Sequence, residues 1–150
     1  MNQGSDGETR LLFEQETPVM LRDTDPAGVL FFARSFTFAH EAYEAFMESR
    51  GLGMARLFRS EGFLIPVVHA EADYCHPLYL GDRAHARLSL EGVGRRSFRL
   101  LTELRAPGGE LSCVVRTTHV AVDKERGKAI PLPEILRKAL CDNTTQGQEH

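Results

Sequence analysis

The sequence predicts an α+β domain in which one long central helix is wrapped by a curved antiparallel sheet of about five strands. One segment, 32–50, carries apolar side chains at spacings of three and four, which is typical of an amphipathic helix. Beyond it the pattern changes to a period of two, in four short segments separated by glycine-containing turns. Short turns favour antiparallel neighbours, and such a sheet has one apolar face that the helix can cover.

The individual elements follow from local patterns. Residues 14–22 are rich in Thr and Val and lack a helical period, so we expect a strand there. The helix over 32–50 is expected to end at Gly51 and Gly53. Its buried stripe is expected to consist of Phe36, Ala39, Tyr43, Phe46 and Met47. The remaining predicted elements are a short helix over 54–60, strands over 67–74, 85–91, 98–104 and 111–122, and a last short helix that ends at Leu140.

The composition indicates one ordinary globular domain over residues 1–150. A chain of 150 residues with 42% hydrophobic and 26% charged side chains can bury a core without disulfides or metals. The two ends, 1–10 and 143–150, are small and polar and predict disorder. We therefore expect an ordered core of about 12–141.

Charge and cysteine content narrow the classes of function. The formal charge of −3 gives no electrostatic case for a nucleic-acid partner, although one or two arginines can still hold a small anionic ligand. Three cysteines without a CxxC spacing predict neither a disulfide framework nor a zinc site, and no ligand cluster indicates a metal or a redox cofactor. The N-terminus lacks an apolar signal segment, and no run approaches the roughly 18 apolar residues of a membrane span. We therefore expect a cytoplasmic protein.

The most informative stretch lies at 23–32 and reads DTDPAGVLFF. It places two carboxylates, a proline and a glycine directly before the apolar start of the long helix. The simpler interpretation is that Asp23 and Asp25 cap a turn and the helix. The alternative is a catalytic acid at the helix entrance, where the first turn offers unsatisfied N–H groups and the positive end of the helix dipole.

This motif opens a long helix that is followed by four predicted antiparallel strands. With this motif and this order of elements, the chain resembles the hotdog-fold acyl-CoA thioesterases of the 4-hydroxybenzoyl-CoA type over about residues 14–140. Within that group, five further strings resemble the 1,4-dihydroxy-2-naphthoyl-CoA thioesterases of phylloquinone biosynthesis. They are HEAYE at 40–44, PVVHAEADY at 66–74, GDR at 81–83, TTHV at 117–120 and PLP at 131–133.

The resemblance implies a hotdog fold and an acyl-CoA thioester hydrolase. The implied reaction converts 1,4-dihydroxy-2-naphthoyl-CoA to 1,4-dihydroxy-2-naphthoate and CoA in phylloquinone (vitamin K1) or menaquinone biosynthesis. CoA would enter only as part of the substrate and product, with no cofactor. The resemblance also implies a homo-oligomer, dimer or tetramer, with each active site at a subunit interface.

The resemblance also assigns roles to individual residues. The catalytic carboxylate is the second Asp of the motif, Asp25, and the oxyanion donor is a backbone N–H at about Phe32. The basic pair that meets the phosphates of CoA falls at Arg95 and Arg96. Taken alone, such a pair is more typical of a solvated turn.

Two histidines are expected to contact the substrate. A carboxylate occupies the position of His40 in the 4-hydroxybenzoyl enzymes, so His40 is expected to face the acyl ring and its hydroxyls, and His69 is expected to bind substrate as well. Taken one by one, His40, His69 and His119 are more typical of packed polar residues. Related thioesterases for short-chain or generic acyl groups carry a His where this chain has Phe32, which favours a bulky aromatic acyl group.

Thioester hydrolysis needs a water or nucleophile at the carbonyl and stabilisation of the developing oxyanion. The sequence has no GxSxG elbow and no Ser or Cys with an evident His partner. A carboxylate can instead attack the carbonyl or activate a water, and the sequence leaves both routes open. Two other interpretations also stay open: a thioesterase for another aromatic or a medium-chain acyl-CoA, and a non-catalytic acyl-CoA-binding module.

Overall fold

The computed structural model describes residues 9–60 and 62–142. Of the ends expected to be disordered, residues 1–8 and 143–150 lie outside the described part, whereas Arg10 already belongs to the first strand. In chain order the elements are β1 (Arg10–Pro18), the 3-10 turn η2 (Leu21–Asp23), α1 (Arg34–Ser49), α2 (Met54–Ser60), β2 (Phe63–Leu64), β3 (Val67–Tyr74), β4 (Arg83–Val93), β5 (Ser97–Arg105), β6 (Leu111–Val120), β7 (Val122–Asp123) and α3 (Glu134–Cys141).

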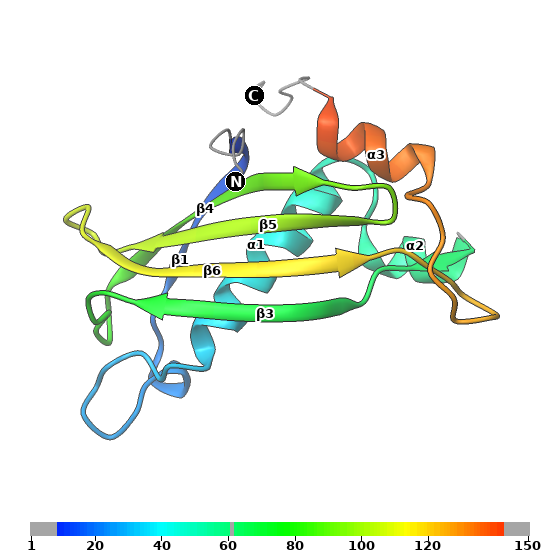
Figure 1. The fold of residues 1–150 in the computed structure, drawn as a ribbon. Coiled ribbons are helices and arrows are strands. Elements are labelled where there is room, and N and C mark those ends of the chain that lie inside the picture. Colours follow the sequence, from blue (N-terminus) through cyan, green and yellow to red (C-terminus); the bar gives the residue numbers. More distant parts are fainter. Residues whose placement is uncertain (1–8, 61, 143–150) are drawn as a thin grey trace.

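Five strands form one antiparallel sheet in the order β1-β4-β5-β6-β3, and α1 lies across one face of it (Figure 1). A separate two-stranded ribbon pairs β2 with β7. The predicted α+β fold, with about five antiparallel strands around one long helix, is therefore confirmed.

One connection contradicts the expectation that short turns join neighbouring strands. β3 pairs with β6 at one edge of the sheet, whereas β4 lies between β1 and β5. The segment 75–82 between β3 and β4 crosses the end of the sheet and is hydrogen-bonded there to the segment before α1. Leu30 N–H donates to the carbonyl of Leu78 at 2.8 Å, and Leu80 N–H donates to the carbonyl of Gly28 at 3.0 Å. The crossing therefore brings the Asp-Pro-Ala-Gly segment next to the chain that follows β3.

The predicted strand over 14–22 is wrong in its bounds, since β1 spans Arg10–Pro18. After Pro18 the chain turns through η2, and the carboxylate of Asp23 holds this turn by accepting a hydrogen bond from Met20 N–H at 2.9 Å. The composition of 14–22 could not predict that β1 ends at Pro18, because the turn that ends it is held by the side chain of Asp23.

α1 confirms the predicted long helix, and it begins two residues later and ends one residue earlier than expected. Its buried residues are Ser35, Phe38, Ala39, Ala42, Tyr43, Phe46 and Met47. Phe36, expected in the stripe, is only half-buried. Burial of each large apolar side chain contributes about 1.5–3 kcal/mol, so this face holds the helix on the sheet. The helix stops at Gly51, whose φ of +79° favours glycine.

β3 is the edge strand farthest from β1, and it is open on both faces: only Ala72 among its eight residues is even half-buried. α1 packs mainly against β1 and β4. One cavity lies between α1 and the β3 side of the sheet, and another lies between the segment before α1 and the end of β3. These spaces hold the candidate site.

The described residues contain no cluster of metal ligands, no disulfide and no helix that could span a membrane. No three His, Cys, Asp or Glu side chains come together as metal ligands would. Cys75, Cys113 and Cys141 are free thiols. None of the described helices has the length and apolar character needed to cross a membrane.

Candidate active site

The Asp-Pro-Ala-Gly segment forms a closed loop ahead of α1. Thr24 and Leu30 form an antiparallel bridge across its base. Inside the loop, Asp25 N–H donates to the carbonyl of Val29 at 2.9 Å, and Gly28 N–H donates to the carbonyl of Asp25 at 2.9 Å. Gly28 has a φ of +79°, a conformation that residues with a Cβ rarely adopt. The predicted turn is confirmed, and its glycine is needed for the shape of the loop.

The two carboxylate oxygens of Asp25 have different surroundings. Oδ1 accepts hydrogen bonds from Ala27 N–H at 2.9 Å and Val29 N–H at 3.1 Å, so it holds the loop closed. Within the described residues Oδ2 accepts no hydrogen bond, and the side chain is only half-buried. One oxygen therefore fixes the carboxylate while the other is open to a water or a substrate carbonyl.

Asp23, the first carboxylate of the motif, is 2% exposed and holds the structure together. Its Oδ1 accepts hydrogen bonds from Nε of Arg34 at 3.1 Å and from Nη2 of Arg34 at 2.7 Å. Its Oδ2 accepts from Met20 N–H. The pair joins the turn before the loop to the first residue of α1, and so it fixes the loop against the helix.

Phe32 lies where the chain enters α1. The entry uses bonds between residues three apart, from Arg34 N–H to the Phe31 carbonyl at 2.8 Å and from Ser35 N–H to the Phe32 carbonyl at 3.3 Å. No acceptor among the described residues pairs with the backbone N–H of Phe32 or of Ala33. Two free donors at the positive end of a helix can polarise a carbonyl oxygen.

A cavity of about 370 Å³ lies beside this helix start. Its lining includes Leu30, Phe32, Tyr74, His76 and Cys113. Burial raises the pKa of the Cys113 thiol to about 11, so this thiol stays protonated at neutral pH and is a poor nucleophile. Asp25 is accordingly the better candidate for the reacting group.

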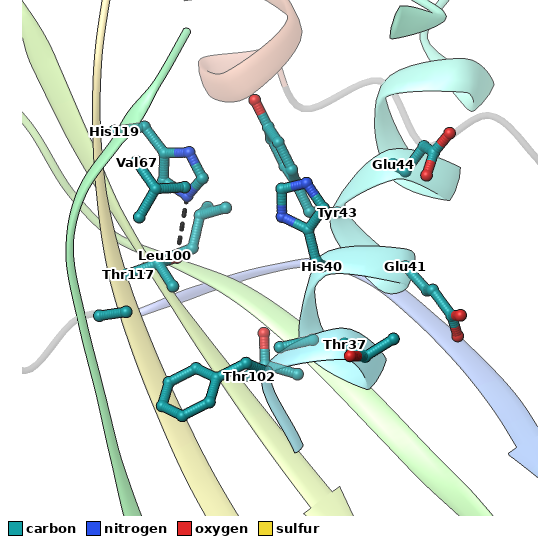
Figure 2. A pocket seen from close by; sticks show the side chains of 13 residues that line it. Thr37, His40, Glu41, Tyr43, Glu44, Val67, Leu100, Thr102, Thr117 and His119 are labelled. Atoms are coloured by element: carbon teal, nitrogen blue, oxygen red, sulfur yellow. Dashed lines mark hydrogen bonds between the residues drawn. The ribbon is translucent and has the colours of Figure 1, made fainter. Parts of the chain in front are cut away.

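A second cavity, of about 470 Å³, lies further along α1. Figure 2 shows His40 and Tyr43 projecting from α1 towards His119 on β6, with Val67 of β3 beside them. The floor includes Leu100 and other residues of β5 and β6. Apolar and aromatic side chains alternate in the lining with polar ones, which include Glu41 and Glu44 on α1.

His119 is a buried, neutral side chain of this cavity. It is 1% exposed, and its Nε2 lies 2.8 Å from the hydroxyl of Thr117. The ring stacks on Phe98 at 4.8 Å between centroids and lies 4.7 Å from the ring of Tyr43. Burial, with a smaller effect from the charge of His40, lowers the pKa of His119 to about 4. The ring is therefore uncharged at neutral pH.

Two buried polar atoms in the lining have no hydrogen-bond partner among the described residues, namely the hydroxyl of Tyr43 and Nδ1 of His119. Burial also raises the pKa of Tyr43, which keeps its hydroxyl protonated. Unpaired buried polar atoms are costly, and these two lie within the packing between α1 and the sheet, out of reach of solvent.

The structure does not bring every predicted site residue to one place. Asp25 lies inside the closed loop, Phe32 follows the loop, and His40 lines the second cavity. His69 is exposed and pairs with Glu71 at 2.8 Å, outside both of these cavities. The sequence missed Tyr74 and His119 as lining residues, because the sheet order that brings them to the cavities is not a local property.

Arg95 and Arg96 are exposed in the turn between β4 and β5, at the end of the sheet opposite to the loop before α1 (Figure 1). β4 has 11 residues, so its two ends are roughly 35 Å apart at about 3.3 Å per residue. Nη2 of Arg137 on α3 donates to the carbonyl of Gly94 at 3.0 Å and supports this turn. Within one chain, Arg95 and Arg96 therefore lie far from Asp25.

The chain matches the model of the thioesterase-like superfamily over residues 19–140. It is 38% identical over 124 residues to a 1,4-dihydroxy-2-naphthoyl-CoA hydrolase of Rippkaea orientalis, covering 81% of this chain and 90% of the relative. It is 34% identical to the enzyme of that name from Synechococcus elongatus, covering 83% and 92%. The crystal structure of a 1,4-dihydroxy-2-naphthoyl-CoA thioesterase from Synechocystis superposes with a TM-score of 0.83 at 31% identity, covering 89% of this chain and 98% of that one. The chain therefore belongs to the thioesterase-like superfamily, as a hotdog-fold member of the family that includes these cyanobacterial hydrolases.

Proposed function

We propose that this protein hydrolyses the thioester of 1,4-dihydroxy-2-naphthoyl-CoA to 1,4-dihydroxy-2-naphthoate and CoA, as a step of phylloquinone biosynthesis. The substrate is the one named for the relatives described above. One observation supports the chemistry most directly. Among the described residues, one carboxylate oxygen of Asp25 accepts no hydrogen bond, and the same loop leads to the N–H groups of Phe32 and Ala33, which have no acceptor there.

The proposed reaction uses these two features together. The thioester oxygen accepts hydrogen bonds from the free N–H groups at the helix start, which stabilise the negative charge that develops on it. Asp25 either attacks the carbonyl carbon or removes a proton from a water that attacks it. In the first route an anhydride between the acyl group and Asp25 forms as the carbon–sulfur bond breaks, and water then hydrolyses this anhydride; in the second route the water adds directly and the same bond breaks. In both routes water supplies the new oxygen of the acid, and CoA leaves as the thiol with a proton that comes from water.

The acyl group is proposed to occupy the cavity beside His40. Its volume of about 470 Å³ falls within the range of roughly 300–1,000 Å³ that is typical of small-molecule sites. Aromatic side chains line it, among them Tyr43 and His119. His40, at the exposed side of the cavity, is proposed as a further contact.

The site is proposed to be completed by a second copy of the chain. The open edge of β3 can pair with the same edge of another copy, and a two-fold axis makes that pairing antiparallel. Antiparallel pairing puts the Val67 end of one β3 beside the Tyr74 end of the other. Arg95 and Arg96 lie at the Val67 end of the sheet. They would then reach the substrate held at the other copy's Asp25, in a dimer or in a tetramer built from two such dimers, and bind the phosphates of CoA.

The place of action is proposed to be the cytoplasm. Cys75 and Cys141 are exposed free thiols, which fit a reducing compartment. His69 remains a proposed substrate contact that only a second copy could bring to the site, because its own chain places it outside the cavities beside α1.

The test is thiol release from purified protein on a small panel of thioesters, with light scattering on the same sample. The panel holds 1,4-dihydroxy-2-naphthoyl-CoA, 4-hydroxybenzoyl-CoA, benzoyl-CoA and a medium-chain acyl-CoA. A kcat/KM at least tenfold higher for the naphthoyl ester, on a dimer or tetramer, is the expected result. Equal values on all four would contradict the proposed substrate, and no hydrolysis would indicate an acyl-CoA-binding module.

A further inference from the structure

The carbonyl of Phe32 is held by two hydroxyl groups. Tyr74 donates to it at 2.7 Å, and Ser35 donates to it at 2.8 Å. The two hydroxyl oxygens lie 3.1 Å from each other. Ser35 N–H reaches the same carbonyl at 3.3 Å, which is long for a hydrogen bond. Most of the bonding to this carbonyl therefore comes from side chains rather than from the helix itself.

The peptide between Phe32 and Ala33 carries both this carbonyl and the N–H of Ala33. The peptide is planar and trans, so its C=O and N–H point in opposite directions. Fixing the oxygen therefore fixes the direction of the Ala33 N–H, which has no acceptor among the described residues. Donation to the oxygen also polarises the peptide and makes its N–H a stronger donor.

The two hydroxyls come from different elements. Ser35 is fully buried in the first turn of α1, whereas Tyr74 is the last residue of the edge strand β3 and is 51% exposed. The ring of Tyr74 meets the ring of Phe32 edge-on, with 6.4 Å between the centroids. A tyrosine of the sheet edge is thus bonded to the backbone at the helix start.

We propose that Tyr74 and Ser35 are positioning residues that orient the oxyanion-binding peptide for thioester hydrolysis. This role rests on the proposed function. Both residues contact the peptide between Phe32 and Ala33 and do not contact the reacting atoms. Removal of a main oxyanion donor typically costs about 100- to 1,000-fold in rate. Removal of one supporting hydroxyl leaves the donor in place, so we expect kcat to fall about 3- to 10-fold with KM unchanged.

The experiment compares kcat, KM and Tm for the wild type, Tyr74→Phe and Ser35→Ala. Tyr79→Phe is the matched control, because Tyr79 has a similar exposed fraction, 50%, on the segment that follows β3. Amide hydrogen exchange at Ser35 reports the order of the first turn without any substrate. The expected result is a lower kcat in Tyr74→Phe and Ser35→Ala, with wild-type kcat in Tyr79→Phe. We also expect faster exchange at Ser35 in Tyr74→Phe.

The oxyanion donor acts on any thioester, so the fall in kcat should be similar for 1,4-dihydroxy-2-naphthoyl-CoA and for benzoyl-CoA. A preference for another ester would overturn the proposed substrate while the lower kcat of Tyr74→Phe on that ester still supports the positioning role. Wild-type kcat in both Tyr74→Phe and Ser35→Ala would overturn the positioning role alone, as would a change confined to KM or Tm. Absence of hydrolysis by the wild type would overturn both proposals.

Discussion

The carboxylate of Asp23 and the guanidinium of Arg34 form an ion pair with a shortest distance of 2.7 Å, and the carboxylate is almost completely buried. The same carboxylate accepts the Met20 N–H. One side chain thus connects η2 with the start of α1, on either side of the loop that carries Asp25. The geometry between Asp25 and the helix start depends on this pair.

Replacing Asp23 by Asn leaves Arg34 without its charged partner. We expect the free energy of unfolding to fall by about 1–3 kcal/mol, because a partly buried cation loses its counterion. Glu16→Gln is the control: it makes the same chemical change in an exposed pair with Arg83 and should cost less than about 1 kcal/mol. Urea unfolding at pH 7 measures both variants, and equal losses would contradict a special role for Asp23.

Replacing Gly28 by Ala should strain the loop. A Cβ at Gly28 has open space around it, so the cost comes from the φ of +79° alone and should be about 1 kcal/mol. We expect kcat to fall as well, since the loop fixes Asp25. Gly62→Ala, with open space and no positive φ, should retain both stability and turnover. An unchanged kcat in Gly28→Ala would show that the loop tolerates another shape.

Acid should destabilise the fold through His119. Burial lowers the pKa of His119 to about 4, whereas a histidine in the unfolded chain titrates near 6.5. Between these values the unfolded chain binds more protons, so the free energy of unfolding falls as the pH falls from about 6.5 to 4, by up to about 3 kcal/mol. Above pH 6.5 this contribution is fully present.

The measurement is urea unfolding at pH 7 and pH 4.5 in the wild type and in His119→Phe. The Phe ring can keep the stacking on Phe98 but cannot take up a proton. The variant should lose less stability than the wild type between the two pH values. Equal losses would mean that other groups cause the acid sensitivity.

Replacing both Arg95 and Arg96 by Gln tests the proposed phosphate contact. We expect KM for the acyl-CoA to rise about tenfold with little change in kcat, since the arginines would hold the phosphates and not the reacting carbonyl. The thioester of the same acyl group with N-acetylcysteamine lacks these phosphates. For that thioester, the variant and the wild type should have the same KM. Arg105→Gln, at a half-buried arginine at the other end of β5, is the control. A rise in KM for both thioesters would point to a general defect instead.

The sequence is sufficient for those parts of the molecule that local patterns determine. α1, α2 and β3 have nearly the predicted bounds, because a period of 3.6 or 2 is a property of the segment itself. The DTDPAGVLFF motif likewise contains Asp25, Gly28 and Phe32 within ten residues. The loop and the helix start could therefore be predicted together.

Non-local contacts explain what could not be predicted. Tyr74 and Ser35 are 39 residues apart in sequence, and the pairing of β3 with β6 brings the edge strand to the helix start. Asp25 and the pair Arg95–Arg96 are far apart because they lie near opposite ends of β4. Their spacing in the sequence does not predict this separation. The end of β1 depends on the carboxylate of Asp23, five residues beyond the strand.

The central claim is that Asp25 acts on the thioester, and its most direct test compares the wild type with Asp25→Asn. An Asn keeps an Oδ1 that can accept from Ala27 N–H and Val29 N–H, so the loop should be retained. The measurement is kcat for 1,4-dihydroxy-2-naphthoyl-CoA together with the Kd of the same ester from binding to the variant. We predict a fall in kcat of at least 100-fold with Kd within about threefold of the wild-type KM. A kcat within a few-fold of the wild type would contradict the catalytic role of Asp25.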